Sequence, residues 1–126
     1  MAKVLVIDDE PNVRSLLDML LRSKGYSVAL ADNGWTGLQL YRLEHPDVIL
    51  LDLNMPKLDG LAVLKQIRSV DLKQPVIVLT GDTSPEREQE VRALGVSEFI
   101  IKGSSLQFLE DTLKRLLHPS VVRQNG

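Results

Sequence analysis

Five short aliphatic runs recur along the 126-residue chain, and each has the length of a β-strand. Most of them are apolar at every position, which is typical of strands that helices cover on both faces of a sheet. The runs lie at residues 4–7, 27–30, 48–51, 76–79 and 99–101. A fold that buries five such strands needs a helical layer on each side of the sheet.

Helical periods separate these strand runs. Leucines and valines recur at i, i+3, i+4 and i+7 in 13–21 and 106–117, and weaker apolar faces lie in 35–41 and 61–67. Strands that alternate with helices require right-handed crossovers and a parallel sheet. We therefore expect an α/β, flavodoxin-like (βα)5 three-layer sandwich with a parallel five-stranded sheet in the order 2-1-3-4-5. The segment 84–94 has few apolar anchors, and we expect it to be loosely held.

The length of the chain fits a single domain. We assign residues 1–118 to this domain, and 119–126 to a tail or the start of a linker, because Pro119 breaks the last helical period. The formal net charge of −2 gives no electrostatic footprint for direct binding of nucleic acid or of an anionic membrane. The absence of cysteine excludes disulfides and thiolate catalysis, and no apolar run approaches the roughly 18 residues of a membrane span. We expect a cytoplasmic protein.

Polar residues follow four of the five predicted strands. In a doubly wound parallel sheet, ligands bind beyond the carboxyl ends of the strands, beside the point where the strand order reverses. The residues at these ends are Asp8, Asp9 and Glu10 after the first strand, Asp52 after the third, Thr80, Gly81 and Asp82 after the fourth, and Lys102 after the fifth. We therefore expect acidic, hydroxyl and basic groups to meet at one edge of the sheet.

Carboxylates that converge in this way repel one another unless a hard cation joins them, and an oxygen-only ligand set suits Mg²⁺. Lys102 would add a point positive charge, and the Thr80 hydroxyl would add a hydrogen-bond donor, as a bound phosphoryl group requires. Carboxylate, metal, lysine and hydroxyl together indicate the formation of an aspartyl phosphate on Asp52. Each residue also has a structural alternative, since acids cap helices, threonines end strands and lysines solvate sheet edges. Their joint occurrence at four strand ends favours a functional site.

Four motifs carry a resemblance to a known family. They are "VIDDE" at 6–10, "LLDLNMPKLDG" at 50–60, "VLTG" at 78–81 and "FIIK" at 99–102. With them the chain resembles, over residues 3 to 117, the response-regulator receiver domains of two-component signal transduction.

The resemblance implies a role for each matching residue. Asp52 corresponds to the phosphoacceptor, and Asp8, Asp9, Asp52 and the backbone carbonyl of Asn54 correspond to the ligands of Mg²⁺, for which Mn²⁺ can substitute. Asp9 is expected to be the more direct ligand of the acidic pair. Lys102 resembles the lysine that binds the phosphoryl group.

Two further functions follow from the same resemblance. Thr80 and Phe99 resemble the switch hydroxyl and the switch aromatic residue, and Asn54 and Asp82 occupy the positions that tune hydrolysis of the acyl phosphate. The chain would be a signalling phosphoacceptor that catalyses only its own phosphorylation and dephosphorylation.

The implied partners are a sensor histidine kinase or histidine phosphotransfer protein, and an effector domain or downstream protein. The output face would comprise the fourth helix, the fifth strand and the fifth helix, through which a homodimer is also expected. Whether the receiver stands alone or belongs to a longer regulator stays open.

The sequence argues against three other functions. A haloacid-dehalogenase-like phosphatase carries a second Asp two residues after its nucleophile, where this chain has Asn54, which cannot donate and regain a proton in that way. A nucleotide-binding module would use glycines where this chain has "DDEPN". A receiver that acts only as a protein-binding module would not need the complete acidic set, Thr80 and Lys102.

One position departs from the family pattern. Receivers usually carry a proline in a cis peptide after the lysine, and this chain has Gly103. A cis bond before a residue other than proline costs roughly 2.5–4 kcal/mol. We therefore predict a trans Lys102–Gly103 peptide, a Ser104 or Ser105 cap on the next helix, and a Lys102 ammonium that still reaches the Asp52 pocket.

Overall fold

The five aliphatic runs form the strands of one sheet in the computed structural model, which describes residues 1–81 and 84–118. The predicted tail at 119–126 lies outside these residues. The strands are β1 (Lys3–Ile7), β2 (Ser27–Ala31), β3 (Val48–Leu51), β4 (Val76–Thr80) and β5 (Glu98–Ile101). The helices are α1 (Pro11–Ser23), α2 (Gly34–Glu44), α3 (Gly60–Val70), α4 (Pro85–Ala93) and α5 (Leu106–Leu117).

The sheet is parallel throughout, and its strand order is β2-β1-β3-β4-β5, so the predicted topology is confirmed. The order reverses at β1, whose Ile7 pairs with Ala31 of β2 and Leu51 of β3. Because these three residues are the last of their strands, the strand ends lie level at the reversal point. The residues that follow β1 and β3 therefore begin at the same edge of the sheet.

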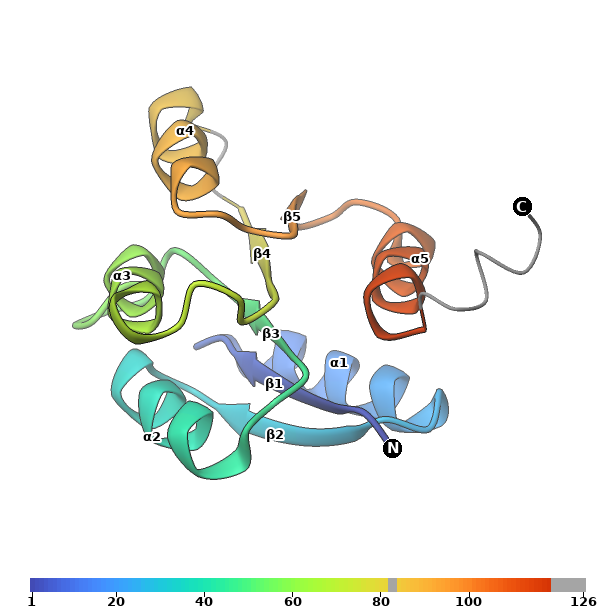
Figure 1. The fold of residues 1–126 in the computed structure, drawn as a ribbon. Helices are drawn as coiled ribbons and strands as arrows, with labels where there is room; N and C mark the ends of the chain where they lie inside the picture. Colours follow the sequence, from blue (N-terminus) through green and yellow to red (C-terminus); the bar gives the residue numbers. More distant parts are fainter. Residues whose placement is uncertain (82–83, 119–126) are drawn as a thin grey trace, which may run out of the picture.

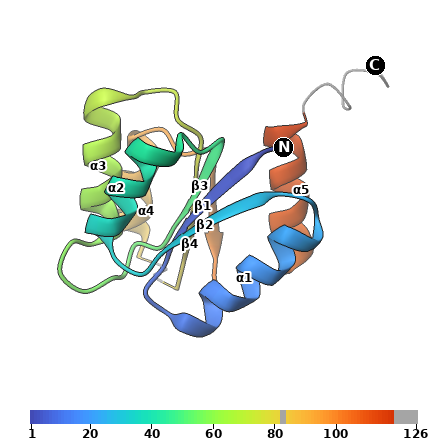
Figure 2. The same ribbon diagram turned by 90° about the horizontal axis from the view of Figure 1, so that it is seen from below.

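Helices cover both faces of the sheet. Figures 1 and 2 show α2, α3 and α4 on one face and α1 and α5 on the other. Each face has its own core: Leu38, Leu64 and Val91 belong to the first, and Leu17 and Leu113 to the second. The strands supply apolar residues to both cores, which explains why β1 and β3 are almost uniformly apolar. None of the helices within the described residues has the length and apolar composition of a membrane-spanning segment.

Three helices on one face of the sheet, α2, α3 and α4, begin at side-chain caps that the sequence provides. Asn33, Asp59 and Ser84 each accept a hydrogen bond from a backbone N–H of the first helical turn of α2, α3 and α4. Pro11 and Pro85 occupy the first helical positions of α1 and α4, where a missing N–H costs nothing. The three side-chain caps fix where the loops that leave β2, β3 and β4 end, and Pro11 marks the end of the loop that leaves β1.

The helix α4 is weakly anchored, as predicted from its composition. Val91 is its only buried residue. Its C-terminal end is held by the buried Arg68 of α3, whose guanidinium donates hydrogen bonds to the carbonyls of Leu94 (2.8 Å) and Gly95 (2.7 Å). Near its N-terminus, Arg87 forms an ion pair with Asp59 at 3.2 Å. Polar contacts therefore hold this helix where apolar packing is sparse.

Candidate functional site

The backbone ladder of the sheet positions three of the predicted site residues. The first residue after β1, Asp8, donates its N–H to a carbonyl of β2 at 3.0 Å, and Asp52 donates to a carbonyl of β1 at 3.0 Å. Lys102, the first residue after β5, donates its N–H to the Thr80 carbonyl at 2.7 Å. Each residue therefore extends its strand by one ladder bond, so its side chain is fixed at the carboxyl edge of the sheet.

The ammonium of Lys102 lies among three carboxylates. Its Nζ is 3.1 Å from Oδ2 of Asp8 and 3.2 Å from Oδ2 of Asp52, and it also binds the carboxylate of Glu10. Asp8 and Asp52 are each only 2% exposed, whereas the Glu10 side chain is 57% exposed. The predicted approach of Lys102 to the Asp52 pocket is thus confirmed.

Asp8 and Asp52 are held in the same way by their own chain. Oδ1 of Asp52 accepts the N–H of Asn54 at 3.1 Å, and Oδ1 of Asp8 accepts the N–H of Glu10 at 2.9 Å. An aspartate that bonds the backbone two residues ahead forms a local turn that restricts its rotamer. In each aspartate the other oxygen, Oδ2, is the one that faces Lys102.

Burial and charge act in opposite directions on these groups. Burial raises the pKa of both Asp8 and Asp52 above the ordinary value, against the backbone hydrogen bonds and Lys102, which lower it. Burial would lower the pKa of Lys102, but its hydrogen bonds to Glu10 and Asp8 and the charge of Asp52 raise it instead. One ammonium pairs with three carboxylates, so Lys102 stays charged, while its single positive charge balances the negative charge of each buried aspartate only in part.

The same three acids form a group that could hold a metal ion. One carboxylate oxygen from each of Asp8, Glu10 and Asp52 lies within 4.8 Å of the others. Asp9, the expected ligand, is half-buried and is not a member of this group, so its role stays a prediction. From the sequence alone, Glu10 is only an acid that follows the first strand. Its place two residues after Asp8, immediately before Pro11, is the signal that could have assigned it to the site.

A family model decides the class of protein. The model described as "Response regulator receiver domain" matches residues 4–114. The chain is a response-regulator receiver domain.

Relatives of the receiver domain agree with this assignment. It is 36% identical over 115 residues to the regulatory protein AtoC of Escherichia coli, covering 91% of this chain and 25% of AtoC. It is 37% identical over 115 residues to the probable transcriptional regulator ycf27 of Guillardia theta, covering 91% of this chain and 45% of that protein. The chain therefore spans less than half the length of these relatives.

Solved structures give the same fold. The chemotaxis protein CheY4 of Vibrio cholerae superposes with a TM-score of 0.84 at 36% identity, covering 92% of this chain and 98% of that one. The response regulator TrrA of Thermotoga maritima, in complex with Mg²⁺ and beryllofluoride, superposes with a TM-score of 0.84 at 32% identity. That match covers 92% of the receiver domain and 99% of the TrrA chain.

The two predicted switch residues are buried in the receiver domain. Thr80 is 0% exposed at the end of β4, and Phe99 is 8% exposed in the core between the sheet and α4. The guanidinium of Arg92, from α4, lies 5.8 Å from the centre of the Phe99 ring. Phe99 therefore lies against α4, Thr80 ends the strand that precedes α4, and the switch roles of both residues stay predictions.

The loop after Lys102 follows the predicted path. No peptide bond within residues 1–81 and 84–118 is cis, so the Lys102–Gly103 bond is trans as predicted. Gly103 has φ of +92°, a left-handed conformation that favours glycine. Ser105 caps α5 by accepting the N–H of Gln107 at 3.1 Å, which confirms the expected serine cap.

Of the two residues predicted to tune hydrolysis, Asn54 is exposed beside the site. Asp82 lies outside the described residues.

Proposed function

We propose that this receiver domain accepts a phosphoryl group on Asp52 from the phosphohistidine of a sensor kinase or phosphotransfer protein. The observation that supports this most directly is the Lys102 ammonium, which contacts the buried carboxylates of Asp8 and Asp52 at 3.1 and 3.2 Å. A phosphoryl group on Asp52 would meet a fixed positive charge at this position.

The donor set fits Mg²⁺. Hard oxygen ligands suit this ion, and the three clustered carboxylates carry more negative charge than Lys102 balances. Asp8, Asp9 and Asp52 with the Asn54 backbone carbonyl would hold Mg²⁺, or Mn²⁺ in its place, and Glu10 lies close enough to contribute. When bound, the ion neutralises charge on the phosphoryl oxygens and so permits approach of the anionic donor.

The chemistry for which the residues are suited is a direct transfer. An Asp52 carboxylate oxygen attacks phosphorus, its O–P bond forms, and the N–P bond of the phosphohistidine breaks, while the departing imidazole takes a proton from solvent. Lys102 stabilises the charge of the transferred group through its N–H donors. In the reverse path to the resting state, water attacks the acyl phosphate and releases inorganic phosphate, and the carboxylate of Asp52 is restored.

We infer that the domain turns over no external phosphomonoester. A phosphatase of this architecture needs a proton donor two residues after its nucleophile, and Asn54 is not one. Asn54 and Asp82 instead occupy the two sequence positions that influence the attack of water on the acyl phosphate in receiver domains. A basic residue at position 82 should slow hydrolysis, so Asp82→Lys is expected to lengthen the lifetime of the phosphorylated form.

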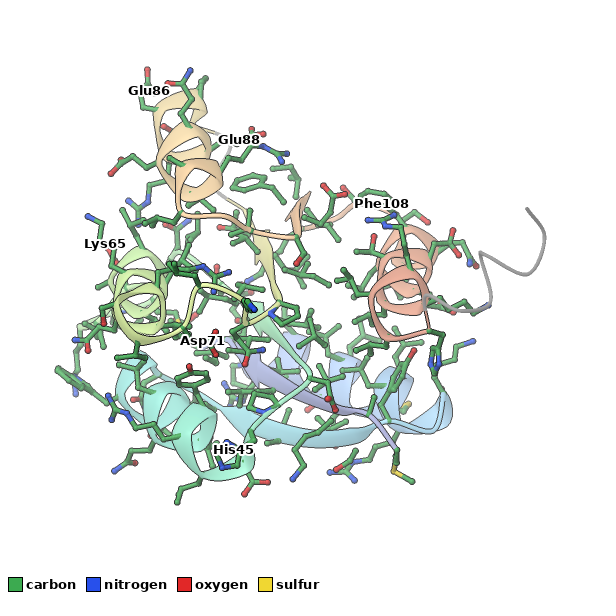
Figure 3. The ribbon with its side chains drawn as sticks, in the orientation of Figure 1. His45, Lys65, Asp71, Glu86, Glu88 and Phe108 are labelled. Carbon is green, nitrogen blue, oxygen red and sulfur yellow. The ribbon has the colours of Figure 1, made fainter. Side chains whose placement is uncertain are left out.

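The signal would leave through α4, β5 and α5. Because its apolar anchoring is sparse, α4 would lose few apolar contacts in a shift that follows the rearrangement of Thr80 and Phe99. Side chains already project from this face: Figure 3 shows Glu86 and Glu88 on α4 and Phe108 on α5, and Phe108 is 42% exposed. An effector domain, a downstream protein or a second copy of the chain would bind there. Because the related regulators are longer than this chain, an effector linked to the receiver in a cytoplasmic regulator is our expectation.

Labelling with acetyl phosphate and Mg²⁺ tests the proposal. We expect one phosphoryl group per chain by intact mass, and none in Asp52→Asn. Asp32→Asn is a matched control, because Asp32 follows β2 at the same edge but is exposed. Full labelling of Asp52→Asn, or turnover of a phosphomonoester by the unaltered chain, would contradict the proposed function.

A further inference from the structure

The side chain of Glu10 makes no hydrogen bond to the start of α1, although its backbone carbonyl accepts the N–H of Arg14 at 3.1 Å. Glu10 occupies the N-cap position, and its N–H is taken by Oδ1 of Asp8. Its exposed carboxylate instead binds Lys102, which lies 92 residues further along the chain. An exposed side chain that gives up its freedom for one partner indicates a role tied to that partner.

Lys102 and a divalent cation would compete for the same oxygens. The ammonium contacts Oδ2 of both Asp8 and Asp52, and these carboxylates belong to the group that could hold a metal ion. Like charges in one pocket repel, so an arriving cation would weaken the hold of the two aspartates on Lys102. Without another anion nearby, the ammonium would move into solvent and would no longer be available to bind the phosphoryl group.

The charges of the cluster leave room for both cations. Three carboxylates against one ammonium leave two negative charges in excess, which one divalent ion balances. Glu10 is the acid best able to keep the lysine, because it is exposed and its side chain can follow the ammonium, whereas Asp8 and Asp52 are buried and fixed by their own turns. A Cβ added at Gly103 would meet no atom within 4 Å, and glycine has wide conformational freedom, so the backbone next to Lys102 can also adjust.

We propose that Glu10 is the positioning residue of Lys102. Its carboxylate keeps an ion pair with the ammonium when a divalent cation binds the oxygens of Asp8 and Asp52, so Lys102 stays in the pocket. The inference rests on the proposed function, because it assumes that the site binds Mg²⁺. It assigns Glu10 an action through Lys102, distinct from direct ligation of the metal.

A double-mutant cycle separates these two actions. Mg²⁺ binding to the metal-free chain is measured by calorimetry for the unaltered protein, Glu10→Gln, Lys102→Met and the double variant. Lys102→Met should tighten Mg²⁺ binding, because the competing ammonium is gone. Glu10→Gln should weaken binding about three- to fivefold when Lys102 is present, the size expected for a partly exposed ion pair, and by less than about twofold in the Lys102→Met background.

Glu44→Gln is the matched control. Glu44 is a partly exposed glutamate that pairs with a lysine, Lys3, at 2.7 Å, but this pair lies at the start of β1, away from the site. This variant removes the same net charge and should leave Mg²⁺ affinity within about twofold of the unaltered chain. Thermal melting of each variant verifies that it is folded.

Three results would overturn the inference. An equal loss of Mg²⁺ affinity for Glu10→Gln with and without Lys102 would make Glu10 a direct ligand of the ion. No loss in either background would leave Glu10 without a role in Mg²⁺ binding. Weaker Mg²⁺ binding by Lys102→Met would exclude competition between the ammonium and the ion. None of these touches the proposed function, which fails separately if the unaltered chain binds no Mg²⁺ or if Asp52 is not the labelled residue.

Discussion

The Nζ atom of Lys102 lies 3.2 Å from Oδ2 of Asp52, although 50 residues separate the two in the sequence. The contact exists because β3 and β5 end at the same edge of the parallel sheet, with β4 between them. It places the Lys102 ammonium beside the buried carboxylate of Asp52, and this ammonium also pairs with Asp8 and Glu10. A functional arrangement of this kind carries an energetic cost, and the cost can be measured.

Asp52→Asn should stabilise the metal-free protein at neutral pH. Burial raises the pKa of Asp52 above its ordinary value of 3.8, so the folded state holds this proton more tightly than the unfolded state. Between the ordinary and the raised pKa the folded state binds more protons, and the free energy of unfolding therefore falls as the pH rises through that window. Asparagine removes this cost, and we expect a gain of about 1 kcal/mol at pH 7.

Urea unfolding at several pH values without Mg²⁺ measures this effect. The difference between Asp52→Asn and the unaltered chain should shrink as the pH falls below the raised pKa, where both side chains are neutral. Asp32→Asn, at an exposed strand end, should stay within about 0.5 kcal/mol at every pH. A less stable Asp52→Asn at pH 7 would mean that Lys102 outweighs burial at this carboxylate.

Arg68→Lys should destabilise the domain although it keeps the charge. The guanidinium donates to four backbone carbonyls, at 2.7–3.0 Å, which join the end of α3 to the two loops beside it. A single ammonium cannot reproduce this fork of donors, so some of the carbonyls are left without a hydrogen-bond donor. We therefore expect the free energy of unfolding to fall by about 3 kcal/mol. Arg22→Lys is the control, since Arg22 is exposed and its pair with Asp18 should contribute less than about 0.5 kcal/mol. Equal losses in urea unfolding would refute a special role for Arg68.

Gly60→Ala should disturb the loop that carries the acceptor. A Cβ at this position would lie 2.0 Å from the Asp52 carbonyl oxygen and 2.6 Å from Cα of Leu53, so the backbone must move. We expect a loss of about 1–3 kcal/mol, the usual range for overpacking, together with slower labelling of Asp52. Gly81→Ala has no atom within 4 Å of the added Cβ and should change stability by less than about 1 kcal/mol. The prediction fails if the two variants behave alike in unfolding and labelling.

Gly103→Ala tests the loop that replaces the proline of other receivers. Its φ of +92° is unfavourable for alanine, which should cost about 1–2 kcal/mol or shift the backbone next to Lys102. Gly25 has a φ of +89°, a Cβ added there would also meet no atom within 4 Å, and the whole of α1 separates it from Glu10. Gly25→Ala should therefore lose similar stability with an unchanged rate of Asp52 labelling, whereas Gly103→Ala should also label more slowly. Identical labelling rates would show that the Gly103 conformation does not position Lys102.

Local signals in the sequence were enough to predict the frame of the site. Strand runs and helical periods reflect which residues are buried on each element, because burial selects apolar residues at regular spacings within one short segment of the sequence. The parallel order and level strand ends then follow from connection rules, so the sequence placed Asp8, Asp52, Thr80 and Lys102 at one edge. The trans peptide at Gly103 was also predictable, because the cost of a cis bond depends on the residue type alone.

Contacts between distant side chains were decided only by the tertiary structure. The sequence marks Asp8, Asp9 and Glu10 as three similar acids, yet Glu10 reaches Lys102 and Asp9 lies outside the metal-capable group. Which acid joins the cluster depends on the turn that Asp8 forms and on the direction in which α1 begins, and no periodicity encodes these. For the same reason the four carbonyls around Arg68 could not be foreseen, because they come together only when α3, the loop after α3 and the loop after α4 have packed.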